Sequence, residues 1–186
     1  MMKPLIFAGL TALLAACSGN PSRLDMSQVQ SELTLRAAVG SAMVRTVSLP
    51  TYAAAEELSV ETPGGLMVSS TDILWADDPS RAVTLTLTRN LGDILNAKIG
   101  PEPWPFVGLP DVSIDVRVTR MIAGADSVFD LEGQYFVGGD GIEYRNSTNR
   151  FAIQAPITAS GATGIADAQA RALSTLSEQI ARKIAR

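Results

Sequence analysis

The chain of 186 residues contains no histidine and a single cysteine, Cys17. Without histidine the sequence lacks the commonest general base and the commonest metal ligand, and one cysteine cannot make a zinc site or an intrachain disulfide. A Ser-His-Asp hydrolase is excluded for the same reason, and no G-x-S-x-G motif is present. The sequence therefore predicts a protein that is not an enzyme, with no catalytic residues, no metal site and no cofactor.

Charged residues are also sparse, at 18% of the chain, and the formal net charge at pH 7 is −4. A nucleic-acid-binding protein would instead concentrate Lys and Arg on one face or along one helix. Hydrophobic residues make up 46% of the chain, which is typical of globular proteins. The length fits one ordinary domain, so we expect a single folded domain that has no nucleic acid as a partner.

An apolar run lies at the N-terminus. Lys3 precedes the uncharged residues 5–14, and the small residues Ala15 and Ala16 follow them, which is the pattern of an export signal peptide. Crossing a bilayer takes roughly 20 apolar residues, so the run is too short for a membrane span. We expect residues 1–16 to be removed from the mature protein.

Leu14-Ala15-Ala16-Cys17 resembles a bacterial lipobox, in which the cysteine thiol receives a diacylglycerol and the peptide is cleaved before that cysteine. On this interpretation Cys17 carries covalent lipid and is not a buried structural cysteine. Ser18 occupies the position where an Asp tends to retain a lipoprotein in the inner membrane, so the sequence resembles a lipoprotein on the periplasmic side of the outer membrane. We expect residues 17–31 to form a lipidated cysteine and a flexible tether, because residues 18–31 are polar.

Residues 32–186 have the pattern of a single α+β periplasmic domain. Alternating apolar residues predict an antiparallel meander in the second half of the chain, and a hairpin is expected around Pro63-Gly64-Gly65. A C-terminal amphipathic helix is expected from Gly161. The expected strands lie at 33–49, 58–60, 66–69, 112–119, 129–137 and 142–153. Together these elements predict a mostly antiparallel sheet with two helices packed on one face.

The first of the two helices depends on a choice between two patterns. Residues 83–88 alternate as in a strand, yet their apolar members also fit one face of a helix that continues to Leu95. Asp78-Pro79 is typical of a helix N-cap followed by the favoured first helical residue, and Gly100-Pro101 is a stop signal. We therefore expect a helix that starts at this aspartate and ends before this glycine.

Six segments follow one another along the chain in a fixed order behind the lipobox. They are Leu49-Pro50-Thr51-Tyr52, Trp75-Ala76-Asp77-Asp78-Pro79, Asn90-Leu91, Pro103-Trp104, residues 111–120 and residues 172–181. In this order they resemble the ABC-type transport auxiliary lipoproteins, the PqiC-like family. The resemblance implies a lipid-anchored periplasmic accessory subunit of an ABC transport system that moves lipids between the inner and outer membranes. It implies two contacts, one with an MCE-domain protein of that transporter and one with the membrane through the lipid on Cys17.

Two alternatives stay open at the level of sequence. One is a free-standing lipid-binding lipoprotein, which would carry extractable lipid without a partner, and the other is a regulatory lipoprotein of a cell-wall synthase. The sequence also leaves open whether several copies of the chain form a homo-oligomer.

Four rigid or aromatic residues at the ends of elements are candidates for contact with the partner: Pro50, Tyr52, Trp75 and Trp104. Interface anchors are often aromatic, although capping and core packing explain Pro50, Tyr52 and Trp75 equally well. For Trp104, a rigid connector is the simpler interpretation of the surrounding prolines.

Overall fold

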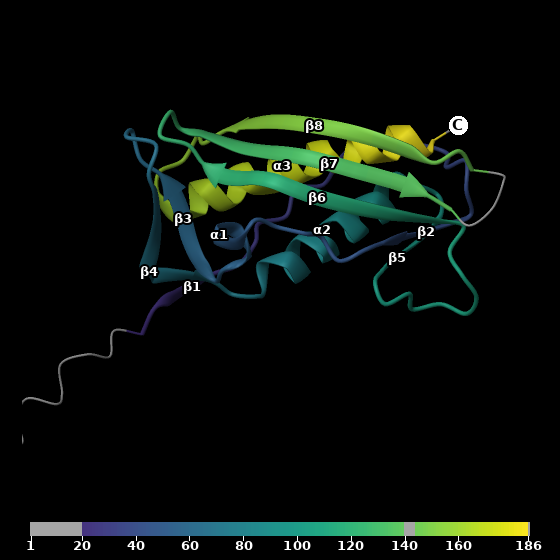
Figure 1. The fold of residues 1–186 in the computed structure, drawn as a ribbon, viewed down its shortest axis with the longest axis horizontal. Helices are drawn as coiled ribbons and strands as arrows, with labels where there is room; N and C mark the ends of the chain where they lie inside the picture. Colours follow the sequence, from purple (N-terminus) through teal and green to yellow (C-terminus); the bar gives the residue numbers. More distant parts are fainter. Residues whose placement is uncertain (1–19, 140–143, 186) are drawn as a thin grey trace, which may run out of the picture.

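The computed structural model describes residues 20–139 and 144–185; Cys17 and the expected signal peptide lie outside the described residues. The described part is one eight-stranded sheet with three helices (Figure 1). The strands are β1 (Ser22–Leu24), β2 (Ser41–Val44), β3 (Glu57–Glu61), β4 (Met67–Trp75), β5 (Lys98–Pro101), β6 (Val112–Ala123), β7 (Val128–Gly138) and β8 (Ser147–Pro156). The helices are α1 (Thr51–Ala54), α2 (Pro79–Ile94) and α3 (Gly161–Ile184).

The long strands β6, β7 and β8 form the antiparallel meander that the sequence predicts. Apolar side chains alternate along each of them, and those that face the helices are buried, such as Val116, Leu131 and Ile153. The polar residues between them face outward. This period of two gives the sheet one apolar face on which the core is built.

The short strands join the meander at the two ends of β6, and most of their pairings are parallel. β2 lies beside the start of β6, with Ala42 opposite Val112, whereas β3 lies beside its end, with Val60 opposite Ala123. β5 extends the sheet beyond β2, and β4 and β1 extend it beyond β3. The pairs β1–β4, β2–β5, β2–β6 and β3–β6 are parallel, so parallel pairing supplements the predicted antiparallel framework.

Helices α2 and α3 cover the apolar face of the meander (Figure 1). Their innermost side chains, including Leu87, Leu91, Leu173 and Ile180, are fully buried. The structure confirms the helix over the ambiguous segment and its start, because an Asp78 carboxylate oxygen accepts a hydrogen bond from the Arg81 N–H at 2.7 Å.

The threonines that favoured a strand are accommodated inside α2. The hydroxyls of Thr84 and Thr88 donate to backbone carbonyls one turn earlier, at 2.7 and 2.8 Å. This back-bonding satisfies the hydroxyls without breaking the helix.

Three boundaries expected from the sequence need correction. The helix ends at Ile94, and residues 98–101 form β5; Pro101 can end this strand because it lies at the edge of the sheet, where a missing N–H costs little. The expected strand at 33–49 is reduced to Ser41–Val44, flanked by isolated bridges at Leu35, Ala37 and Ser48. The last strand of the meander, expected at 142–153, runs over 147–156 within the described residues, and residues 142 and 143 lie outside them.

The segment 22–31, which the sequence assigned to the flexible tether, packs on the domain. β1 pairs with the end of β4, with Ser22 opposite Ile73. The hydroxyls of Ser27 and Ser31 donate to Asp167 and Glu178 of α3, each at 2.6 Å. Residues 22–31 therefore pack as part of the folded domain, because β1 pairs with β4 and the two serines hydrogen-bond to α3.

Candidate interaction sites

Pro50 and Tyr52 lie at the short helix α1, against the end of the sheet that β3 and β4 build. Pro50 occupies the N-cap position of α1, and both residues are half-buried. The Tyr52 hydroxyl accepts a hydrogen bond from the backbone N–H of Met121 in β6 at 3.1 Å. This bond gives Tyr52 a structural part in tying α1 to the sheet, and its contact with a partner stays a prediction.

Trp75 ends β4 and is buried, with 8% of its surface exposed. It packs with Leu58 and Ala166 in a small cluster of its own. Tyr52 and Trp75 line the same small pocket of about 20 Å³, so the structure brings these two candidates together. Trp75 can present its ring to a partner only if this packing opens.

Trp104 lies far from the other three candidates, in the loop between β5 and β6. The loop folds back on β5, because a Cβ on Gly100 would lie 3.1 Å from the Trp104 ring and 2.8 Å from Pro105. Trp104 is half-buried, packs edge-to-face with Phe106 at a ring separation of 4.9 Å, and has no hydrogen-bond partner for its buried indole nitrogen among the described residues. The Trp104 ring therefore packs between the loop and β5 and stabilises the loop.

The outer surface of the same loop carries three exposed apolar side chains: Phe106, Val107 and Leu109, which we call the loop patch. Val107 is fully exposed and Leu109 is 81% exposed. Figure 1 shows the loop extending away from the sheet at the end where β2 and β5 lie. The prolines that flank these residues restrict the backbone, which lowers the entropy lost when a partner binds.

A second exposed apolar group lies at the turn between β3 and β4: Leu66, Met67 and Val68, which we call the tip patch. Leu66 is 71% exposed. The turn lies at the opposite end of the molecule from the loop patch (Figure 1). Sequence reasoning identified the turn and the proline-rich loop but missed both patches. One sequence signal could have indicated the patches: apolar residues directly beside Pro-Gly-Gly, or between prolines, lie in turns and loops that helices and strands do not cover.

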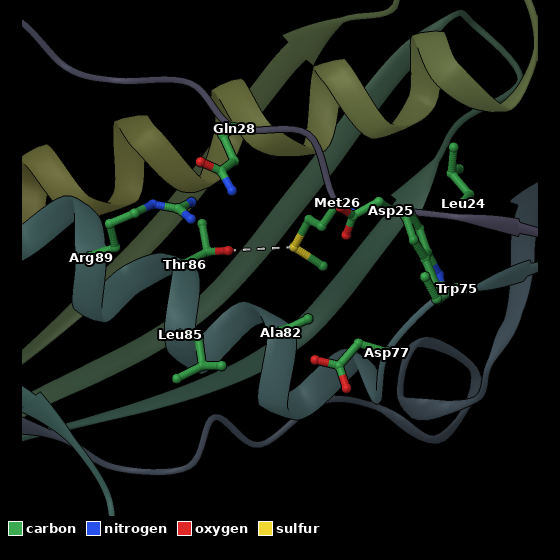
Figure 2. A pocket seen from close by; sticks show the side chains of 11 residues that line it. Leu24, Asp25, Met26, Gln28, Trp75, Asp77, Ala82, Leu85, Thr86 and Arg89 are labelled. Atoms are coloured by element: carbon green, nitrogen blue, oxygen red, sulfur yellow. Dashed lines mark hydrogen bonds between the residues drawn. The ribbon is translucent and has the colours of Figure 1, made fainter. Parts of the chain in front are cut away.

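A shallow cleft separates the N-terminal segment from α2 (Figure 2). Its volume is about 160 Å³. The Thr86 hydroxyl contacts the Met26 sulfur at 3.7 Å across the cleft, while Asp77 and Arg89 lie along α2 and its start. A small cleft with charged and apolar walls suits a side chain or a small polar molecule better than an acyl chain.

Ion pairs occupy the outward face of the sheet. Arg120 of β6 pairs with Glu61 of β3 and with Asp130 of β7, the latter at 3.0 Å. Arg117 holds Asp115 at 2.8 Å, and this hydrogen-bonded cation keeps the pKa of Asp115 below its usual value. The Arg120 pairs join neighbouring strands, whereas the Arg117–Asp115 pair lies within β6. The lowered pKa of Asp115 does not suit a general acid.

Within residues 20–139 and 144–185, no group of three or more carboxylate, thiol or imidazole side chains is placed to hold a metal ion. None of the helices in these residues is long and apolar enough to span a bilayer. The described features are thus two apolar patches at opposite ends, shallow clefts and an ion-paired sheet face.

The family described as "ABC-type transport auxiliary lipoprotein component" matches residues 23–181. The chain belongs to this family. The match begins in β1 and ends within α3, so the segment 22–31 that packs on α3 falls almost wholly inside the family's domain. The family is an auxiliary part of ABC-type transport and is not a known enzyme family.

Two crystal structures share the fold of this auxiliary lipoprotein. One is protein XCC0632 from Xanthomonas campestris, described by the family DUF330, with a TM-score of 0.70 and 13% identity over 88% of this chain and 94% of that one. The other is described as an uncharacterized protein, with a TM-score of 0.67 and 18% identity over 88% of this chain and all of that one. No curated protein matches the chain.

Proposed function

We propose that this auxiliary lipoprotein is a non-enzymatic, lipid-anchored subunit of an MCE-type ABC transport system. In this role it stands on the periplasmic side of the outer membrane and supports the movement of lipids between the two membranes. The observation that carries the proposal is the family match over residues 23–181, directly behind a sequence that resembles a lipobox at Cys17.

The loop patch is the surface we assign to the MCE-domain partner. Two of its side chains, Val107 and Leu109, are the most exposed large apolar groups in the described part of the chain, and exposed apolar groups on a constrained backbone favour protein contact. The patch lies at the end of the domain away from β1 (Figure 1). A partner that reaches from the inner membrane would meet this end, because the anchor holds the β1 end near the outer membrane.

A free-standing lipid carrier is the second candidate, and the cavities give it little support. A pocket that encloses a drug-sized ligand has a volume of roughly 300–1,000 Å³ and largely apolar walls. The largest cavity among those described, about 380 Å³, lies over the start of α3 and is lined partly by Ser127, Thr158 and Ser160. Apolar residues such as Val60 and Ile165 line the rest of it, but the depression is open to solvent and would not enclose an acyl chain.

The proposal is tested by purifying the full lipidated protein from membranes of cells that encode it and identifying what accompanies it. We expect an MCE-domain protein to be recovered. Replacing two members of the loop patch together, Val107→Asp with Leu109→Asp, should reduce that recovery at least roughly tenfold, since buried charge in an apolar contact is costly.

The control is Leu85→Asp, which makes the same kind of substitution once, at an exposed apolar residue of α2. This variant should retain the partner. Extractable lipid in the absence of any MCE-domain protein would support the carrier instead, and equal recovery with all three proteins would remove the loop patch from the interface.

A further inference from the structure

The turn between β3 and β4 forms a firm apolar protrusion. The Leu66 carbonyl accepts hydrogen bonds from the backbone N–H and the hydroxyl of Thr62, at 2.8 and 3.0 Å. Gly65 supplies the positive φ of 75° that this turn needs. The backbone is therefore satisfied internally, and Leu66, Met67 and Val68 project outward without a covering element.

The protrusion also lacks charge. Residues 62–71 include no Asp, Glu, Lys or Arg. The nearest charged groups lie at its base, where Glu61 is paired with Arg120 and Asp72 faces solvent. At the same end of the domain Arg23 is paired with Glu56 at 3.0 Å, so Arg23 and Arg120 are both already paired with carboxylates.

The start of the folded chain lies at this same end of the molecule (Figure 1). Ser22 is paired with Ile73 of β4, and Met67 lies six residues back along that strand, about 20 Å at the usual rise per residue. Four residues separate Ser22 from Cys17, and five extended steps span at most about 17 Å. A lipid on Cys17 therefore lies at most about 37 Å from the tip patch, within reach of the same membrane surface.

From this juxtaposition we propose that the tip patch inserts into the surface of the membrane that holds the lipid anchor. The inference rests on the proposed lipidation of Cys17 and adds a second contact to it. The attraction is apolar rather than ionic, since the chain is net negative and the tip has no cation to bind lipid phosphates. Two contacts fix the orientation of a domain that one flexible anchor would leave free, and they direct the loop patch away from the membrane.

A fluorescent probe at the tip tests the insertion. The full lipidated protein with Leu66→Cys is labelled with an environment-sensitive dye and reconstituted into vesicles of phosphatidylethanolamine and phosphatidylglycerol. We expect the emission to shift to the blue and to be quenched severalfold by lipids brominated on their acyl chains. The matched control, Val107→Cys in the loop patch, should show neither change and should be quenched by aqueous iodide.

The outcomes separate this inference from the proposed function. An intact mass that shows Cys17 without lipid overturns the anchor and the insertion together. A lipidated Cys17 with a probe at position 66 that stays accessible to iodide overturns the insertion alone. Protection of that probe that rises with protein density and is insensitive to brominated lipid would assign the tip to a second copy of the chain, which also overturns the insertion.

Discussion

Gly133 lies in β7 opposite Val118, where the pairing of β6 and β7 shifts register. A Cβ at this position would collide with the backbone carbonyl oxygen of Arg117 and would lie 2.8 Å from the Phe151 ring. Neither neighbour can move easily, because one is backbone and the other is a buried aromatic. We expect Gly133→Ala to lower the free energy of unfolding by about 2–3 kcal/mol, the cost of overpacking a core, as measured by urea denaturation.

The matched control at the residue scale is Gly92→Ala. Gly92 lies on the exposed side of α2, and a Cβ there would meet nothing within 4 Å. Alanine should therefore raise the free energy of unfolding by about 0.5–1 kcal/mol through helix propensity. If both substitutions shifted stability in the same direction, the assignment of Gly133 to a close backbone approach would be wrong.

At the scale of elements, the start of α2 is fixed by one side chain. Asp78 accepts the Arg81 N–H at 2.7 Å and precedes Pro79. Asp78→Ala leaves that N–H without its cap and should cost about 1 kcal/mol of unfolding free energy. Asp93→Ala, the same change in the last turn of α2, should cost nothing or stabilise slightly, because a negative charge opposes the helix dipole there. Denaturation of the two variants side by side checks the difference, and equal losses would contradict the cap.

The same local signals explain which elements the sequence could predict. The N-cap of α2 is a local sequence signal, and the alternation along β6 and β7 repeats over many residues. Both patterns are therefore visible without the fold. β1, β2 and β5 are three or four residues long, too short to show a period, and they exist because strands distant in sequence pair with them. The tip and loop patches were missed for a related reason, since exposure depends on which elements pack nearby.

At the scale of the whole molecule, the β3–β4 hairpin is joined to the meander by few contacts. β3 pairs with β6 at one position, Val60 with Ala123, and Arg120 adds its ion pair to Glu61 across the same junction. Tyr52 reinforces it through the hydrogen bond from Met121. These contacts set the direction of the tip patch relative to the loop patch, so the two patches keep a fixed relative orientation only while this junction holds.

The segment 22–31 provides the test of how the domain meets its anchor. Two chains, one beginning at residue 20 and one at residue 32, differ by β1, by the half-buried Leu24 and Met26, and by the serine hydrogen bonds to α3. Partial burial of two apolar side chains contributes about 2 kcal/mol in total, so the shorter chain should be less stable by about that amount in urea. If the chain from residue 20 unfolds at the same urea concentration as the shorter one, residues 22–31 belong to the flexible tether. The tip patch could then lie much farther from the membrane than the pairing of β1 with β4 allows.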